Sequence, residues 1–167
     1  FDAQALLSFL PNLPQNKLKG EYYLTDLIPI LIKAGRKVQA SIIADAHLAL
    51  GINDRVQLAY AASRMRENIN ARLMRSGVTM LDPASTYIDA EVEVGRDTVI
   101  YPHCILEGKT VVGENCRLGP GLHLVDTRVE NGVSCRQGLV IESSLGEGAN
   151  IGPFVHIRPG SRIGAAT

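Results

Sequence analysis

The sequence predicts a parallel β-helix of hexapeptide repeats in its C-terminal half, preceded by a connecting α-helix and a short mixed α/β segment. Three observations predict it: aliphatic residues recur every six positions, glycine often follows them, and small or β-branched residues come four positions after them. A six-residue period fits neither the 3.6-residue helical turn nor simple strand alternation. It is the period of a prism in which each flat side uses one hexapeptide.

The N-terminal segment, residues 1–50, has the pattern of mixed α/β structure. Asp2 to Leu10 is expected to form a helix that the following proline stops. Leu24 to Ala34 predicts a second helix, ended by Gly35 at the position just beyond it. Lys37 to Ile43 has strand propensity. One or two helices and one strand cannot close a core, so we expect this segment to need more chain or a partner.

Residues 55–76 have the clearest helical pattern in the chain. Apolar side chains recur at three- and four-residue steps, and Gly77 follows as the stop. Glu67 is the lone acid on a helix with several arginines, which favours a solvated face on a connecting helix over a binding patch. The apolar residues are Leu58, Ala62, Met65, Ile69 and Leu73, and the arginines are Arg55, Arg64, Arg66, Arg72 and Arg75.

From about Pro83 onward the six-residue ladder dominates. Three hexapeptides make one coil of about 18 residues, so this segment is expected to give a little over four coils, in the left-handed form. Between the two regular runs the frame shifts through Val129, Cys135 and Ile141, and we expect adjusted turns near Asp126 and Ser143. The ladder consists of Ile88, Val94, Ile100, Leu106, Val112, Leu118 and Leu124, followed by Leu145, Ile151, Ile157 and Ile163.

The three cysteines are expected to be buried structural thiols. Cys104 and Cys116 each come four positions after a ladder residue, where small side chains turn inward. No CxxC spacing is present, and the odd number argues against a disulfide framework.

Charge and composition narrow the class of protein. Acidic and basic residues balance at 17 each, which favours neither nucleic acid nor a membrane surface. The apolar stretches are too short for a membrane span and no signal-peptide pattern opens the chain, so a soluble cytoplasmic protein is expected. Because position 1 is Phe and the last residue falls inside a repeat, we also expect a fragment of a longer protein.

Two residues are candidates for functional sites. Asn53 precedes the basic helix, where Asn or Asp is a favoured N-cap; an N-cap oxygen can also be offered to a metal or phosphate-bound ion. Arg158 follows a ladder residue at a position where small residues are common, and its planar guanidinium suits phosphate recognition. A helix cap and a solvated surface arginine are the structural alternatives.

The histidines are scattered and suggest no metal site. His103 and His123 lie 20 positions apart, close to one coil, but no third histidine has the spacing that a zinc centre would need. Nor does the sequence contain a Ser-His-Asp arrangement or a phosphate-binding glycine loop. The sequence therefore contains no complete catalytic constellation.

Several blocks resemble a known family. They are Gly20-Glu21-Tyr22-Tyr23-Leu24-Thr25-Asp26, Gly51-Ile52-Asn53-Asp54-Arg55-Val56-Gln57-Leu58, Gly77-Val78-Thr79, Asp82-Pro83, Gly152-Pro153-Phe154 and Arg158-Pro159-Gly160. In this order they resemble an internal fragment of the bacterial bifunctional N-acetylglucosamine-1-phosphate uridylyltransferase/glucosamine-1-phosphate acetyltransferase (GlmU-type) family. The resemblance covers nearly the whole chain.

The resemblance implies a domain organisation. It makes residues 1–50 the C-terminal remnant of an α/β nucleotidyltransferase domain and residues 51–82 the connecting helix. Residues 83–167 would be the N-terminal coils of a left-handed β-helix acetyltransferase domain.

The resemblance also implies two reactions for the parent protein. One transfers acetyl from acetyl-CoA to glucosamine 1-phosphate; the other couples N-acetylglucosamine 1-phosphate to UTP, giving UDP-N-acetylglucosamine, a peptidoglycan precursor, and pyrophosphate. By the same resemblance Asn53 corresponds to a ligand of Mg2+ in the uridylyltransferase site, and Arg158 to a sugar-phosphate-binding residue of the acetyltransferase site. A homotrimer is implied as well.

The departures from the family matter as much as the matches. The family's nucleotide-binding loop, the aspartate that shares the metal, and the coils that carry the histidine general base have no counterpart in this sequence. We therefore expect the isolated chain to catalyse neither reaction. The alternative is a non-catalytic β-helix module for trimerisation or interaction. A third reading, another sugar-nucleotide pyrophosphorylase with a β-helix tail, fits the Arg158 block less well.

Overall fold

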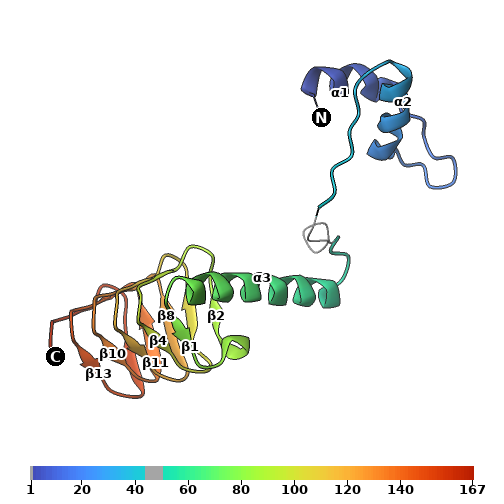
Figure 1. The fold of residues 1–167 in the computed structure, drawn as a ribbon. Coiled ribbons are helices and arrows are strands. Elements are labelled where there is room, and N and C mark those ends of the chain that lie inside the picture. The colour runs from blue at the N-terminus through green and yellow to red at the C-terminus, as the bar shows by residue number, and fades with distance from the viewer. Residues whose placement is uncertain (1, 44–50) are drawn as a thin grey trace. The chain divides into compact units, whose positions relative to one another are not determined.

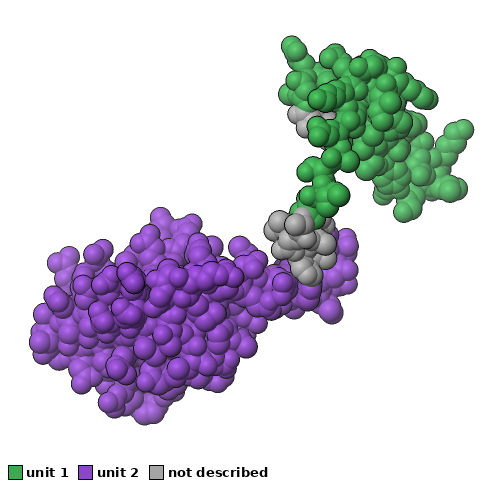
Figure 2. Space-filling model, viewed as in Figure 1, with its two compact units in different colours: residues 1–48 green, residues 49–167 purple. Residues whose placement is uncertain are grey.

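The computed structural model describes residues 2–43 and 51–167, and the chain divides into two compact units (Figure 1). Unit 1 comprises residues 1–48 and unit 2 comprises residues 49–167, drawn in separate colours in Figure 2. Within the described part, no helix is long and apolar enough to cross a membrane.

Unit 1 contains two short helices. Helix α1 (Ala3–Phe9) begins at the N-cap Asp2, whose carboxylate accepts a hydrogen bond from the Ala5 amide at 2.8 Å. Pro11 does not stop the chain from turning: the helix tightens into the 3₁₀ segment η1 (Leu10–Asn12), in which proline occupies an early position that needs no amide donor.

The second helix of unit 1 ends as its sequence predicts. The 3₁₀ turn η2 (Leu24–Asp26) leads into α2 (Leu27–Lys33), and Gly35 follows at φ 69°. The amide of Gly35 bonds to the Ile32 carbonyl and that of Arg36 to the Leu31 carbonyl, both at 3.0 Å. This pair of bonds is the Schellman motif, in which glycine adopts the left-handed conformation at lowest cost.

The strand expected at Lys37 to Ile43 is wrong. This stretch forms no strand, and among the described residues of unit 1 the single strand-like contact is the antiparallel bridge between Gln15 and Tyr22. A strand needs a neighbour that accepts and donates its hydrogen bonds, and none of residues 2–43 and 51–167 pairs with this stretch. In the described part of unit 1 the buried hydrophobic side chains are Leu27 and Leu31.

Unit 2 begins with the 21-residue helix α3 (Arg55–Arg75). The N-cap is Asp54, whose carboxylate accepts from the Gln57 amide at 2.8 Å. At the other end Gly77 adopts φ 106°, as expected for the residue that stops a helix. The last turns of α3 pack against the first coil of the β-helix, and the C-terminus of the chain lies at the opposite end (Figure 1).

The rest of unit 2 is a parallel β-helix of three five-stranded sheets. Sheet 1 consists of β1 (Thr79–Met80), β4 (Val99–Ile100), β7 (Arg117–Leu118), β10 (Ser134–Cys135) and β13 (Asn150–Ile151). Sheet 2 consists of β2 (Tyr87–Ile88), β5 (Ile105–Glu107), β8 (Leu122–Val125), β11 (Gly138–Ile141) and β14 (Val155–Ile157). Sheet 3 consists of β3 (Glu93–Val94), β6 (Val111–Val112), β9 (Arg128–Val129), β12 (Ser144–Leu145) and β15 (Arg162–Ile163).

Each sheet therefore receives one strand from each of five coils, rather than the little over four that the ladder predicts. The difference comes from the first coil. Strand β1 pairs with β4 and brings Met80 into the core, but Met80 lies eight residues before Ile88, outside the six-residue frame. The 3₁₀ turn η4 (Pro83–Ser85) takes up the extra residues.

The interior is filled by the ladder side chains, as predicted. Ile100, Leu106, Leu118, Leu124 and Leu145 are fully buried, and each contributes about 1.5–3 kcal/mol by leaving water. The positions four residues after the ladder are buried too in the first coils and include Val92, Thr98, Cys104, Thr110 and Cys116. The three cysteines are buried and free, which confirms the expectation of structural thiols.

One ladder residue is assigned wrongly by the six-residue step. Val140, not Ile141, points inward: it pairs in register with Leu124 and Ile157 and is fully buried, whereas Ile141 is half-buried. Leu124 and Val140 are separated by 16 residues, whereas Leu106 and Leu124 are separated by 18.

The coil from Leu124 to Val140 lacks two residues because Leu124 and Val129, between sheets 2 and 3, are five residues apart, and so are Cys135 and Val140, between sheets 1 and 2. In the turns between sheets 2 and 3 of this coil and the next, Asp126 and Glu142 occupy the left-handed region, at φ 45° and 42°. Each of these turns uses one residue fewer between successive inward positions, which shifts the frame. The adjusted turns expected near Asp126 and Ser143 are thus found at Asp126 and at Glu142, next to Ser143.

Candidate functional site

Arg158 lies on the turn that leaves sheet 2 in the last coil. It follows β14 directly and is exposed. Arg158, Pro159, Gly160 and Ser161 form a type II β-turn: proline holds the second position, Gly160 has φ 78° at the third, and the Ser161 amide bonds to the Arg158 carbonyl at 3.3 Å. The turn fixes the backbone from which the guanidinium projects.

Two serine hydroxyls also reach the carbonyl of Arg158. The Ser143 hydroxyl donates to it at 2.8 Å and the Ser161 hydroxyl at 2.6 Å. Ser143 belongs to the coil below and is 7% exposed, so it ties the last coil to its neighbour at this residue.

A shallow groove of about 360 Å³ lies beside this turn. Arg128, Ser144 and Arg162 stand in register on adjacent strands of sheet 3, so a hydroxyl lies between two guanidinium groups. Glu130 accepts from Nε of Arg128 at 2.7 Å, and this bond raises the Arg128 pKa above its ordinary value. The groove is lined by Asp126, Arg128, Glu142, Ser143, Ser144, Gly160, Ser161 and Arg162, a set that offers partners to both anionic and cationic groups.

Asn53 lies outside the β-helix, just before α3. Its backbone amide donates to Gln57 Oε1 at 2.6 Å, and the capping role that sequence left open between Asn53 and Asp54 belongs to Asp54. The side chain is exposed and its amide oxygen accepts no hydrogen bond from any described residue. That oxygen is a ligand of the type that Mg2+ prefers, but Mg2+ takes six, so Asn53 fits as one contributor to a site completed elsewhere.

The structure does not bring the two candidates together. Asn53 precedes the far end of α3, whose last turns pack on the first coil, and Arg158 belongs to the fifth coil (Figure 1). They are thus suited to two separate sites. Among residues 2–43 and 51–167, no three His, Cys, Asp or Glu side chains are grouped so that they could hold a metal ion.

The arginines of α3 are more than the solvated face expected from sequence. Arg66 lies over the Tyr87 ring at 4.6 Å, Arg72 donates to the Ala90 carbonyl at 3.1 Å, and Arg64 pairs with Glu67 on the same helix. The first two contacts fasten the helix to the first coil. Sequence alone could not indicate them because their partners lie in strand β2 and in the loop that follows it.

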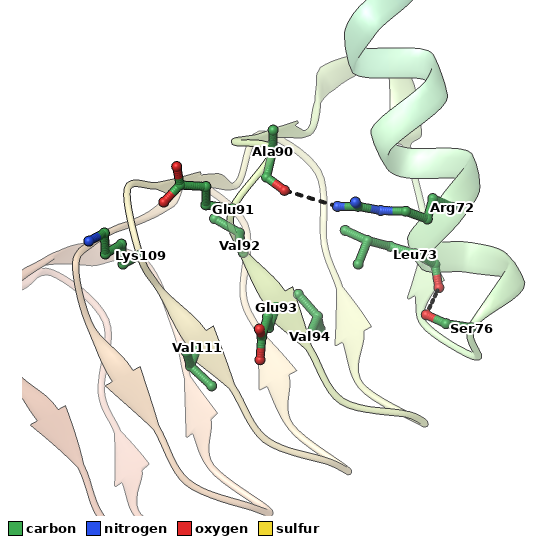
Figure 3. Close-up of a pocket in the computed structure, with 10 residues that line it drawn as sticks. All are labelled: Arg72, Leu73, Ser76, Ala90, Glu91, Val92, Glu93, Val94, Lys109 and Val111. Atoms are coloured by element: carbon green, nitrogen blue, oxygen red, sulfur yellow. Dashed lines mark hydrogen bonds between the residues drawn. The ribbon is translucent and has the colours of Figure 1, made fainter.

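A larger groove, of about 690 Å³, lies where α3 meets the first coil (Figure 3). Arg72 reaches across it toward Ala90, and Leu73 points from the helix toward the β-helix. Its charged groups have opposite signs, with Arg72 and Lys109 against Glu91 and Glu93, so it has no net preference for an anion or a cation. It contains neither sequence-predicted site residue.

One histidine has an acidic partner on the outer face of sheet 2. Nε2 of His123 lies 2.6 Å from Oε2 of Glu107, one coil below. The sequence did not indicate this pair, because its two residues come from different coils and meet only through the register β5–β8. Within the described part of the chain the pair belongs to no group of side chains that could hold a metal ion, and we interpret it as a surface contact between coils.

Together, the six-residue core ladder and three parallel sheets define a left-handed parallel β-helix protein of the hexapeptide-repeat class, preceded by helix α3. Over nearly its whole length the chain is homologous to a segment of bifunctional GlmU proteins, which confirms the resemblance noted in the sequence.

Curated relatives give the measure of this similarity. The chain is 47% identical over 163 residues to the bifunctional protein GlmU of Geobacillus sp. (strain WCH70), and 49% identical over 164 residues to that of Acetivibrio thermocellus. The bifunctional protein GlmU of Enterococcus faecalis is 44% identical over 165 residues. These matches cover 98–99% of this chain but 36% of each relative, so the chain spans about a third of their length. No protein-family model matches the chain.

Proposed function

We propose that this chain is part of a bifunctional enzyme that makes UDP-N-acetylglucosamine. The β-helix half acetylates glucosamine 1-phosphate with acetyl-CoA, and the N-terminal half couples N-acetylglucosamine 1-phosphate to UTP with release of pyrophosphate. The observation that supports this proposal is the identity of 43–49% to bifunctional GlmU proteins over 98–99% of the chain.

In the acetyl transfer, Arg158 binds the phosphate of glucosamine 1-phosphate. Its guanidinium is exposed and can form two parallel hydrogen bonds to phosphate oxygens, which hold the sugar in one orientation. The amine of the sugar attacks the thioester carbonyl only after losing its ammonium proton. The general base that takes this proton comes from a part of the enzyme outside this chain.

In the uridylyl transfer, Asn53 contributes one oxygen ligand to Mg2+. The ion supplies stabilisation of the negative charge on the phosphoryl groups. The side chain of Asn53 is exposed, and its backbone is held at the start of α3 because the Asn53 backbone amide donates to Oε1 of Gln57. A second protein ligand and the nucleotide-binding loop lie outside the chain, which is why we expect the isolated chain to be inactive.

The parent enzyme is proposed to assemble as a cytoplasmic homotrimer through side-by-side β-helices. This is supported by the outer face of sheet 2, where several apolar side chains remain half-exposed to solvent. They are Ile105, Val125, Leu139 and Ile141. Apolar groups on an outer face favour contact with a second copy.

Two assays test the proposal, each run on the full-length protein that carries this segment and on the 167-residue chain. One follows UDP-N-acetylglucosamine formation and the other acetyl-CoA consumption. We expect both reactions in the full-length protein and neither in the chain. Turnover of either substrate by the chain alone would contradict its inactivity, and a full-length protein inactive in both would favour a non-catalytic module.

Arg158→Ala in the full-length protein should lower kcat/KM for glucosamine 1-phosphate by about 10- to 100-fold, because it removes charge-assisted hydrogen bonds. Uridylyl transfer should be unchanged. Arg117→Ala is the matched control, since Arg117 is an exposed arginine on the outer face of sheet 1. Equal loss of both activities in Arg158→Ala would indicate a structural role for this arginine.

A further inference from the structure

We infer that Ser143 and Ser161 are positioning residues for Arg158, and that they hold its turn ready to bind the sugar phosphate before substrate arrives. The inference rests on the proposed function of Arg158 and adds two residues to that site. Neither serine needs to touch the substrate, because both act on the carbonyl oxygen of Arg158.

The carbonyl of Arg158 is held from two directions. Ser161 donates to it from within the turn through both its hydroxyl, at 2.6 Å, and its amide, at 3.3 Å. Ser143 donates from the coil below at 2.8 Å, through a hydroxyl it shares with the Ile141 carbonyl at 2.6 Å. Pro159 also restricts the backbone conformation of the residue before it, so the backbone of Arg158 has little conformational freedom left.

The coil below shows what the same hydroxyl does where no arginine is present. Thr127 occupies the position equivalent to Ser143, and its hydroxyl donates to Val125 at 2.8 Å and to Val140 in the next coil at 3.2 Å. Val140 is an inward ladder residue. The residue equivalent to Val140 in the last coil is Ile157, but Ser143 donates to the carbonyl of the next residue, Arg158.

The acceptor moves because the last turn is longer. Three positions separate Val140 from Ser143, but four separate Ile157 from Ser161. The additional residue allows the type II turn, and it presents the Arg158 carbonyl to the hydroxyls. The longer turn of the last coil thus makes possible the hydrogen bonds that hold the backbone of Arg158.

Holding this backbone matters because a guanidinium binds phosphate through a planar fork. Two parallel hydrogen bonds form only when the fork has one orientation, and a loosely held turn would lose freedom at the moment of binding. A turn that is already fixed loses less conformational freedom on binding. The serines should therefore improve substrate affinity and leave the rate of the chemical step unchanged.

The test uses the full-length protein with Ser143→Ala, Ser161→Ala and Ser143→Thr. For each alanine variant we expect the KM for glucosamine 1-phosphate to rise about three- to tenfold, as loss of one hydrogen bond allows, with kcat within about twofold of wild type. Ser143→Thr should keep the wild-type KM, because Thr127 shows that a threonine fits the equivalent position and that its hydroxyl reaches a carbonyl of the next coil.

Thr127→Ala is the matched control, since it removes the equivalent hydroxyl from a turn without an arginine. It should lower the melting temperature about as much as Ser143→Ala and leave KM unchanged. An equal rise of KM in both variants, or no rise in either, would show that the hydroxyls serve stability alone. If Arg158→Ala itself left KM unchanged, the proposed role of Arg158 would fall, and the positioning role with it.

Discussion

At the scale of single residues, the carbonyl of Arg158 accepts hydrogen bonds from two hydroxyls, that of Ser161 in its own turn and that of Ser143 in the coil below. An arginine at a position usually filled by small residues departs from the repeat, and that departure is visible in the sequence. Its contact with Ser143 depends on the number of residues in two successive turns. The six-residue ladder placed Ile141 inward and so put the second frame shift after this residue, whereas part of that shift lies before Val140.

The buried cysteines give a prediction at the same scale. Burial raises the pKa of the Cys104 thiol to about 11 and that of Cys135 to about 12, and it raises the pKa of Cys116 as well. At pH 8 a thiol reagent should therefore leave the folded chain unmodified and modify all three cysteines after denaturation, measured by mass spectrometry. Rapid modification of the folded chain would contradict the burial of these thiols.

The raised pKa values also predict how stability changes with pH. Unfolded thiols ionise near pH 8.5, whereas the folded ones stay protonated, so the unfolded state binds fewer protons above that pH. The contribution of these thiols to the free energy of unfolding is fully present below about pH 8.5. It decreases as the pH rises toward 11, by up to about 1.4 kcal/mol per pH unit for each thiol. Denaturant unfolding should show a shallower decline in a Cys104→Ala/Cys135→Ala variant; an equal slope would contradict the linkage.

At the scale of elements, α3 shows how a helix pattern and its packing can differ. The apolar spacing correctly predicts a helix that ends before Gly77. Yet Leu58 and Met65 are more than half exposed, and Leu73 is the apolar residue of this face that is buried. Periodicity reports which residues share a face, but the length of helix that meets the first coil decides how much of that face is covered.

Asn70 makes the buried hydrogen bonds between α3 and the first coil. It is 1% exposed and its amide donates to the Pro83 carbonyl at 2.9 Å and the Thr86 carbonyl at 3.0 Å. Asn70→Ala should lower the free energy of unfolding of unit 2 by about 2–3 kcal/mol, because it leaves two carbonyls without their donor. Asn68→Ala, at an exposed position of the same helix, should change it by less than about 0.5 kcal/mol. Similar losses in chemical denaturation would contradict the anchoring role.

At the scale of the whole chain, the β-helix is stabilised by stacking of one coil on the next. Among the residues that the structure describes, its hydrophobic core comprises side chains from Ile69 to Ile163. Close contact between coils sets strict limits: a Cβ at Gly95 would lie 2.5 Å from the backbone of Gly113. No single coil buries enough apolar surface to fold alone, so the five coils should unfold together.

The separate core of unit 2 predicts that it folds without unit 1. A chain lacking residues 1–48 should melt within about 2 °C of the full 167-residue chain in circular dichroism, because none of its core side chains is removed. A fall of more than about 5 °C on deletion would show that unit 1 stabilises the β-helix. Unit 1 itself, whose described residues bury few apolar side chains, should show little cooperative melting.

The repeat, the inward ladder of the β-helix, the buried thiols and the boundaries of α3 could all be predicted from the sequence, because each follows from residues close together in the chain. The predictions for Lys37 to Ile43 and for Ile141 were wrong, because there the outcome depends on a neighbouring strand or on the number of residues in a turn. The hydroxyls that reach Arg158 and the carbonyls that bind Asn70 are known from the folded structure alone. These contacts join residues from different coils or elements, and they form only once the register between coils is set.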